Sequence, residues 1–405
     1  MPATFAYKVR DREGRLVEGS LEADSSELVV SKLRSMGYVP VAIERSDASG
    51  LKKDIKLPFG GGVKQKDVAV FSRQFDTMIN AGLSLIRALH ILEEQTENEK
   101  LGETARSVRT DVERGSSLAQ ALGRHPKVFN RLYVAMVKAG EAGGVLDSVL
   151  LNLAATIEKQ VELKRKIKSA MTYPVAVFGL VCVIVTAMLM FVVPTFEKLY
   201  ADLGGTLPAP TRLLLAVSKF VTSFFPFIVL AGIVGLFLLR RWIATDQGRA
   251  VWDALKLKIP VFGKLVHKTA ITRFCRTLSV LLRSGVPVLE SLEITSETVG
   301  NVVVARAVKD TQEAVKGGES MASPLMKHAV FPPMVVQMLS VGEETGAVDD
   351  MLDRVADFYD QEIEATVDAL TSLLEPLLIV VMGGAVGGMV VALYMPMFNI
   401  INLVQ

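Results

Sequence analysis

Three long apolar stretches set the strongest limit on how this chain can fold. None of them contains a charged side chain, and they run from Pro174 to Val193, from Phe220 to Leu239 and from Pro376 to Leu393. A helix of roughly 20 apolar residues spans the hydrocarbon core of a bilayer. Because that core offers no water to unpaired backbone groups, we expect each stretch to form a transmembrane helix.

Composition agrees with a membrane protein and excludes two other classes. Half of the 405 residues are hydrophobic, and the mean hydropathy is +0.37. With 45 basic against 43 acidic side chains, the net charge is only +2. This argues against a dedicated nucleic-acid binder, which gains affinity by neutralising phosphates. The two cysteines, Cys182 and Cys275, are too few for a disulfide scaffold.

Basic residues beside the apolar stretches predict how the chain is oriented, because cytoplasmic loops are enriched in Lys and Arg. They precede the first stretch and directly follow the second, at Lys164, Arg165, Lys166, Lys168, Arg240 and Arg241. Residues 1–20 contain no apolar segment typical of a signal peptide. We therefore expect a multi-pass protein of the cytoplasmic (inner) membrane, with its N-terminus in the cytoplasm and its C-terminus outside.

The sequence contains a direct internal repeat. FSRQFDTMINAGLSLIRALHIL, from Phe71, aligns with FCRTLSVLLRSGVPVLESLEIT, from Phe274. The shift is 203 residues at first and 202 from Phe129 onward, and it continues into the first and third stretches, where Pro174 aligns with Pro376. The second stretch has no counterpart in the repeat. We interpret it as the span that brings the chain back to the cytoplasm, so that the second unit has the same orientation as the first. A direct repeat also counts against a transporter built from inverted repeats.

Helical spacing of apolar residues, interrupted by glycines, predicts about six helices in each repeat. The expected fold is an all-α integral membrane protein with two cytoplasmic helical bundles. Alternating apolar residues predict a small ββαβ module at 1–45, either free to find a partner or packed as an accessory domain, and a flexible linker follows at 46–63. The other expected boundaries are 64–172 for the first bundle, 173–194 for the first span, 195–219 for an external connection, 220–239 for the second span, 240–372 for the second bundle, 373–395 for the third span and 396–405 for an external tail.

Motifs for catalysis and nucleotide binding are missing from the sequence. It contains no GxxxxGK[ST], GxGxxG, HExxH or GxSxG pattern. We therefore expect a protein that is not an enzyme and that holds no cofactor. Glu375 is an acidic residue at the mouth of the third span, where it could either reach the membrane interface or accept a basic group of a partner.

The third span contains two overlapping GxxxG patterns, formed by Gly383, Gly384, Gly387 and Gly388. Glycines four residues apart share one face of a helix and let another helix approach closely. We favour a contact between two copies of the chain. Packing against the chain's own first or second span is the alternative.

Opposite charges distinguish the two repeats. The helix expected before the first span is basic, with Lys159, Lys164, Arg165, Lys166 and Lys168. Its counterpart is acidic, with Asp349, Asp350, Asp353, Asp357, Asp360, Glu362, Glu364 and Asp368. The two helices could bind each other within an oligomer, hold different partners, or simply be solvated. The basic cluster could also anchor the first span on anionic lipid.

The segment from Lys166 to Pro194, KIKSAMTYPVAVFGLVCVIVTAMLMFVVP, resembles the signature of the GspF/PilC family. These are inner-membrane platform proteins of type II secretion and type IV pilus machines. The repeated GExxG turn, here GEAGG at Gly140–Gly144 and GEETG at Gly342–Gly346, resembles the family too, as does the layout of two repeats and three spans. The resemblance covers roughly residues 5–400.

The resemblance implies a function without catalysis. Such a platform couples a hexameric cytoplasmic ATPase to pilin or pseudopilin subunits in the membrane. Its bundles would contact the ATPase, and its spans would face the hydrophobic helices of the subunits. Other inner-membrane assembly proteins and self-association as a dimer or higher oligomer are expected as well.

Two groups of site residues follow from the resemblance. Glu141 and Glu343, with Asp147 and Asp349, are candidates for fixing the turns that present the ATPase-facing surface, and local capping of helices is the alternative. Some relatives resemble calcium binders in the first bundle. Glu93 and Asp147 are the acidic candidates here, although Leu151, one turn further on, cannot be a ligand.

Two other classes of protein compete with the platform. A transporter or channel would carry a polar pathway and charges within the membrane, and Glu375 is the single candidate for such a charge. A membrane-anchored signalling scaffold would also fit the layout. The sequence leaves open whether the machine is a secretion system, a pilus or a DNA-uptake device, how many copies assemble, and whether the platform rotates.

Overall fold

The computed structural model describes residues 3–10, 16–23, 25–46, 62–202, 208–260 and 262–401, and these are mostly helical. The chain divides into two units, Met1–Gly62 and Val63–Gln405. The predicted linker at 46–63 lies largely outside the described residues.

The first unit consists of β1 (Ala3–Arg10), β2 (Leu16–Ala23), α1 (Ser26–Ser35) and β3 (Val39–Ser46). The strands pair in the order β2-β1-β3, and both pairs are antiparallel. A small apolar core forms between the sheet and the helix, from Phe5, Val9, Val29 and Leu33.

The first repeat of the second unit forms a helical bundle. Its helices are α2 (Gln65–Asn80), α3 (Leu85–Gln95), α4 (Glu99–Glu113), α5 (Leu118–Gly123), α6 (Arg131–Gly143) and α7 (Leu146–Ala187). Polar side chains fix several helix starts, because each accepts a hydrogen bond from a backbone N–H of the first turn. Asn98, Ser117 and Asn130 do so for α4, α5 and α6.

The second repeat forms a bundle of the same order. Its helices are α11 (Phe262–Arg283), α12 (Val288–Thr298), α13 (Val302–Lys316), α14 (Ala322–Met326), α15 (Pro333–Thr345) and α16 (Val348–Ile401). A further helix, α10 (Asp246–Lys258), precedes them and was not expected from the sequence. The buried Asp253 of α10 accepts a hydrogen bond from the N–H of Val302 at 3.0 Å, so α10 caps the start of α13.

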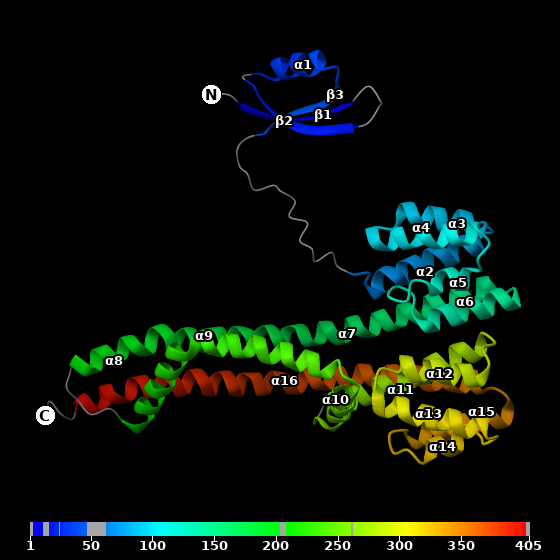
Figure 1. Ribbon diagram of the computed structural model, residues 1–405. Helices are drawn as coiled ribbons and strands as arrows, with labels where there is room; N and C mark the ends of the chain where they lie inside the picture. The colour runs from blue at the N-terminus through cyan, green and yellow to red at the C-terminus, as the bar shows by residue number, and fades with distance from the viewer. Residues whose placement is uncertain are drawn as a thin grey trace. The chain divides into compact units, whose positions relative to one another are not determined.

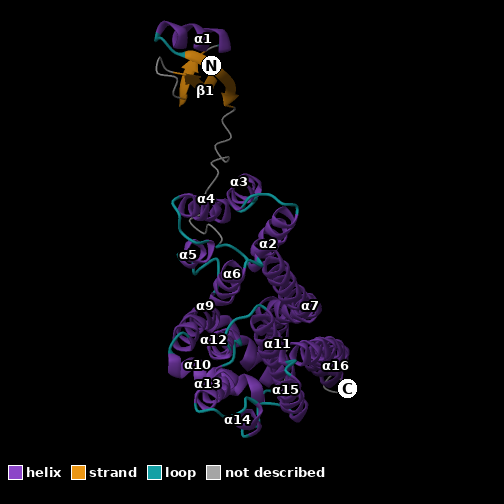
Figure 2. Cartoon of the chain, turned by 90° about the vertical axis from the view of Figure 1, so that its right-hand side faces the viewer, coloured by secondary structure: helices purple, strands orange, loops and turns teal. Residues whose placement is uncertain are grey.

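The two bundles share an apolar core. Val280, Leu281, Val286 and Ile294 of the second repeat lie in the same cluster of buried side chains as the core of the first. In the end-on view of Figure 2, α2–α6 and α11–α15 form two groups of helices. The two repeats therefore pack as one body.

Three helices of the second unit are long and apolar enough to cross a membrane, in agreement with the sequence. The first is α7, which continues through the π-helical turn η1 (Met188–Val192) into α8 (Val193–Asp202). The others are α9 (Ala209–Ile243) and α16. In Figure 1, α16 runs alongside α7 and α9. Both α7 and α16 pass without interruption from a bundle into an apolar span.

Hydroxyl groups join the three apolar helices to one another. Ser218 of α9 donates a hydrogen bond to the carbonyl of Leu189 in η1 at 2.5 Å, where the π-helical turn disturbs the regular backbone pattern. Thr211, also of α9, donates to the carbonyl of Ala392 in α16 at 2.6 Å. Such bonds matter in lipid, because a polar group there finds no water.

Candidate interaction site at the junction of the two repeats

The glutamate of each GExxG motif caps a neighbouring short helix. The carboxylate of Glu141 accepts hydrogen bonds from the N–H groups of Leu118 and Ala119, at 2.6 and 2.9 Å, at the start of α5. Glu343 does the same at the start of α14, where Met321 and Ala322 donate at 2.6 and 3.2 Å. These N–H groups have no partner within their own helix, and the negative charge suits the positive end of the helix dipole. The geometry supports the local-capping alternative for both glutamates.

The glycines of the motif have two different backbone roles. Gly144 and Gly346 end α6 and α15 in the left-handed conformation, with φ of 67° and 72°, which favours glycine. Gly342, the first glycine of GEETG, is enclosed instead. A Cβ there would lie 2.8 Å from the Cα of Val348. The motif therefore fixes a tight turn between two packed helices.

Asp147 and Asp349 do not cap the long helices from outside, which corrects the expectation that each is an N-cap. Each is the second residue of its helix, and the N-cap of α7 is Val145. Asp147 is exposed, whereas the carboxylate of Asp349 accepts a hydrogen bond from Arg283 at 3.3 Å. Their negative charge in the first helical turn still complements the helix dipole.

Replacing Glu343 with glutamine should lower the free energy of unfolding by about 1–2 kcal/mol, because an amide nitrogen then faces a backbone N–H that previously donated to a carboxylate. The matched control is Glu344→Gln, since Glu344 is the exposed neighbour and should change stability by less than about 0.5 kcal/mol. Thermal and denaturant unfolding of both variants would show the difference. Equal effects would contradict the capping role.

The acidic face of α16 is occupied within the chain. Arg276 of α11 is only 6% exposed, and its guanidinium pairs with Asp353, Asp357 and Asp360 at 2.5, 2.7 and 2.7 Å. The same pattern recurs about two turns from Arg276 in each direction along α11. Arg283 pairs with Asp349, Asp350 and Asp353, and Lys268 pairs with Glu362.

Further ion pairs join the two repeats directly. Lys159 of α7 pairs with Asp357 of α16 at 2.9 Å, and Lys166 pairs with Glu364 at 2.5 Å. On the other side of the junction, Arg131 of α6 contacts two glutamates of α12, Glu293 and Glu297. The opposite charges of the two long helices therefore meet inside one chain. Asp357 and Glu364 meet the basic helix directly, and the other paired carboxylates of the stripe bind Lys268, Arg276 or Arg283 of α11. Asp350, Asp357 and Glu364 keep much exposed surface, so a contact of this stripe with a partner or with a second copy stays a prediction.

Arg276 is the residue of this junction that sequence reasoning missed. It was aligned with Arg73 in the repeat, but no role was assigned to either. In the first repeat Arg73 pairs with Glu158, which aligns with Asp360. The second repeat adds carboxylates at positions where the first has Leu151 and Ala155. An arginine repeated opposite an acidic stripe was the available signal.

Glu375 and the two aligned prolines lie within continuous helices. Pro174 is buried inside α7, and Pro376 is exposed inside α16. Glu375 is exposed and forms no hydrogen bond or ion pair with the described part of the chain. Its two interpretations, at the membrane interface or opposite a partner's basic group, both stay predictions.

The GxxxG face of α16 is open. A Cβ placed on Gly383, Gly384, Gly387 or Gly388 would meet no described atom of the chain within 4 Å. The alternative in which these glycines pack against the chain's own spans is therefore wrong. A contact with another helix, from a second copy or a partner, stays a prediction.

Comparison with known proteins decides the family. The family model described as "Type II secretion system (T2SS), protein F" matches this chain twice, at residues 71–194 and 274–396, and the model of the N-terminal domain of the same family matches residues 1–44. Together these matches cover more than half of the chain. The chain belongs to this family, as the resemblance in its sequence indicated. The double match also agrees with the internal repeat.

Members of the family resemble the chain over its whole length. The "Type IV pilus assembly protein PilC" of Myxococcus xanthus is 43% identical over 405 residues, which are 100% of this chain and 96% of the relative. The protein of the same name from Thermus thermophilus is 46% identical, with 98% of each chain covered. The "Type II secretion system protein F" of Vibrio cholerae is 33% identical, with 100% of each covered.

The residues suggested for calcium do not fit that ion. Both carboxylate oxygens of Glu93 accept hydrogen bonds from arginines, from Arg106 at 2.6 Å and from Arg109 at 2.9 Å. Asp147 is exposed and forms no bond to the described residues. Calcium takes roughly six to eight oxygen ligands, yet no group of three or more acidic, histidine or cysteine side chains in the described ranges is placed to hold a metal.

The stabilisation that Glu93 provides should depend on pH. The hydrogen bond from Arg106, with that from Arg109, holds the pKa of Glu93 below its usual range. The contribution of Glu93 to the free energy of unfolding is therefore complete above the ordinary carboxylate pKa, and it is lost as the pH falls through the lower pKa of the folded state. The difference in melting temperature between wild type and Glu93→Gln should be largest near neutral pH and shrink in acid. Glu94→Gln, at an exposed neighbour, is the control, and a stabilisation by added calcium that Glu93→Gln abolishes would contradict this account.

Proposed function

We propose that this protein is a non-enzymatic inner-membrane platform for assembling a type IV pilus, and that it couples a cytoplasmic assembly ATPase to pilin subunits in the membrane. The observation that carries the proposal is the match of the family model to both repeats, together with relatives that cover the chain from end to end. The pilus is favoured over a secretion machine because the pilus-assembly relatives are 43% and 46% identical, against 33% for the secretion protein.

The architecture suits such coupling. Because α7 and α16 each run without a break from a bundle into a span, a force applied to the bundles reaches the membrane along rigid helices. The apolar core and ion pairs between the repeats make the two bundles move together. We assign the bundles to the cytoplasm, because of the basic residues beside the spans.

The open glycine face of α16 is our candidate for the helix that the platform receives. Glycines on one face let a second helix approach closely, and weak Cα–H contacts and van der Waals packing then hold it. The partner would be the hydrophobic helix of a pilin subunit. A second copy of the chain is the alternative occupant.

The first test is genetic and biochemical. Deleting the gene should abolish surface pili, and the wild-type gene should restore them. The detergent-extracted protein should then co-purify with the assembly ATPase of the same cell. Normal pili in the deletion strain, with normal secretion, would overturn the proposal and favour a membrane-anchored scaffold.

The glycine face has a matched test of its own. Gly384→Leu should leave the chain folded, since nothing lies within 4 Å of its Cβ position, but it should block assembly and reduce cross-linking to pilin. Gly235→Leu places the same side chain on an equally open glycine of α9, outside any GxxxG pattern, and should have little effect. Reduced cross-linking between copies, with pilin cross-linking intact, would assign the face to self-association instead.

A further inference from the structure

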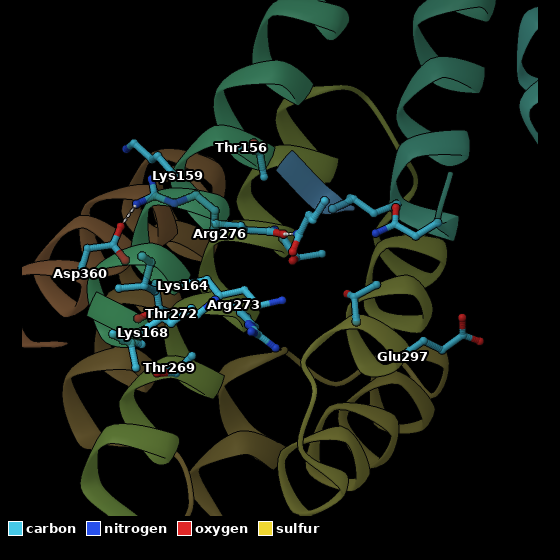
Figure 3. Close-up of a pocket in the computed structure, with 18 of the residues that line it drawn as sticks. Thr156, Lys159, Lys164, Lys168, Thr269, Thr272, Arg273, Arg276, Glu297 and Asp360 are labelled. Carbon is cyan, nitrogen blue, oxygen red and sulfur yellow. Dashed lines mark hydrogen bonds and ion pairs between the residues drawn. The ribbon is translucent and has the colours of Figure 1, made fainter. Parts of the chain in front are cut away.

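A cavity of about 640 Å³ lies between the two repeats, lined mainly by α7 and α11. Five of its lining side chains are basic and two are acidic. Both acidic groups are already paired, Asp360 with Arg276 and Glu297 with Arg131. In Figure 3 the labelled side chain of Glu297 points away from the opening. The cavity therefore has an excess of positive charge.

Three of the basic groups have no partner in the part of the chain that the structure describes. Lys159 pairs with Asp357 across the junction and Arg276 pairs with carboxylates of its own repeat, whereas Lys164, Lys168 and Arg273 form no side-chain hydrogen bond or ion pair with any described residue. Figure 3 shows the guanidinium of Arg273 directed into the opening. Arg273 keeps exposed surface, yet the protein packed around it lowers its pKa by partial desolvation, and no carboxylate raises that pKa. All three side chains keep exposed surface, so water and salt weaken their mutual repulsion, and an anion bound between them would replace it with attraction.

The arrangement suits a phosphoryl group. A guanidinium presents several N–H donors in a plane, and the two lysines add point charges. Lys164 and Lys168 are four residues apart on α7 and so share one of its faces. Thr269 and Thr272 of α11 also line the cavity, but their hydroxyl groups donate to the carbonyls of Leu265 and Lys268, so the charged groups are the donors to an anion.

The position of the cavity indicates where the phosphoryl group comes from. Lys168 precedes Pro174, the start of the apolar stretch, by about 9 Å along the helix. That distance places the membrane end of the cavity, where Lys168 and Met171 lie, at the depth of the lipid headgroups beside the first span. Leu163, Ile167 and Met171 give the cavity an apolar wall in addition, as an acyl chain would require.

We propose that Arg273, Lys164 and Lys168 form a binding site for a phosphoryl group, which the headgroup of an anionic phospholipid supplies. A soluble phosphate ester shares this chemistry and is the other source. A lipid bound here would contact both repeats at the membrane surface, so it would stabilise the packed form of the junction.

The site can be tested on the full-length protein in a neutral detergent. Dioctanoyl phosphatidylglycerol should bind more tightly than dioctanoyl phosphatidylcholine, as measured by native mass spectrometry and by a shift of the melting temperature. Arg273→Gln should weaken binding of the anionic lipid about tenfold, since it removes a charge-assisted contact. A variant with both Lys164→Gln and Lys168→Gln should weaken it at least as much.

The matched control is Arg165→Gln. Arg165 lies on the same basic segment of α7, yet it lines a different hollow on another face of the helix. It should leave the affinity unchanged, and all variants should elute as the wild type in size-exclusion chromatography to show that they fold. Inorganic phosphate and glycerol phosphate serve as soluble probes.

The results of these binding experiments distinguish a lipid headgroup from a soluble phosphate ester as the source of the phosphoryl group. Loss of lipid binding in Arg273→Gln but not in Arg165→Gln supports the lipid site. Binding of a soluble phosphate ester with the same pattern of variants, without a preference for the anionic lipid, supports the phosphoryl site and overturns its lipid source. Equal loss in Arg165→Gln and Arg273→Gln, or no binding of any probe, overturns the proposal.

Discussion

Replacing Arg276 with methionine is expected to lower the free energy of unfolding by about 3–5 kcal/mol, which is typical when one partner of a buried ion pair is removed. The wild-type guanidinium is almost fully buried and contacts three carboxylates. Burial disfavours its charge, but these carboxylates hold the pKa of Arg276 above its ordinary value. Methionine leaves Asp360 without a cation, Asp357 with Lys159 alone and Asp353 with Arg283 alone. Denaturant unfolding in detergent would measure the loss.

The internal repeat provides the control for this variant. Arg73 occupies the aligned position, but its side chain is 39% exposed and it pairs with two carboxylates, those of Asp76 and Glu158. Water and salt screen such a pair, so Arg73→Met should cost clearly less than Arg276→Met. If the two variants lose the same stability, burial of the charge is not what makes Arg276 important.

The second large effect concerns the core that the two repeats share. Leu281→Ala is expected to lower the free energy of unfolding by about 2–5 kcal/mol, because it removes a fully buried side chain and leaves a cavity. Leu281 belongs to the second repeat but packs in the apolar cluster of the first. Its loss should therefore loosen both bundles, and amide hydrogen exchange should rise in both.

Leu278→Ala is the matched control for this effect. Leu278 lies on the same helix and is equally buried, but it packs in the core of the second bundle alone. Its exchange should rise mainly in the second repeat. Confinement of the Leu281→Ala effect to one bundle would show that the shared core does not couple the repeats.

The spans and the repeat could be predicted because they depend on local pattern. An uncharged apolar stretch of this length has few alternatives to a membrane helix, and a direct repeat is visible without a structure. The GExxG motif was found in the same way. The sequence could not show whether Glu141 caps a helix or faces a partner. The N–H groups that donate to its carboxylate belong to residues more than 20 positions earlier in the chain.

The pairing of charges could not be predicted for a different reason. The sequence shows that the helix before the first span is basic and its counterpart acidic, but not that one chain folds these helices together. Contacts between a basic helix of one copy and an acidic helix of another would pair the same charges equally well. Only the packing of α7 and α16 distinguishes the two cases, and that packing depends on apolar contacts between residues far apart in the chain, such as Ile167 and Ile363.

The exact start of helix α7 and the presence of helix α10 could not be predicted from the sequence either. Aspartate after glycine is a common N-cap signal, yet α7 begins at Leu146, so Asp147 falls inside the first turn. Helix α10 was missed because it lies between the second span and the start of the recognised repeat. The buried position of Asp253, which makes α10 part of the bundle, depends on its contact with α13.

The central claim is that the opposite charges of the two repeats join them within a single chain. The most direct test places cysteines at Lys166 and Glu364, whose side chains form one of these pairs, in a chain whose two natural cysteines have been replaced. A short bismaleimide should cross-link the double variant in membranes without forming a covalent dimer, and mass spectrometry should find the two peptides linked. Co-expressed chains that carry one cysteine each should give no covalent dimer, whereas a strong dimer from these split chains, with no link inside the double variant, would contradict the account.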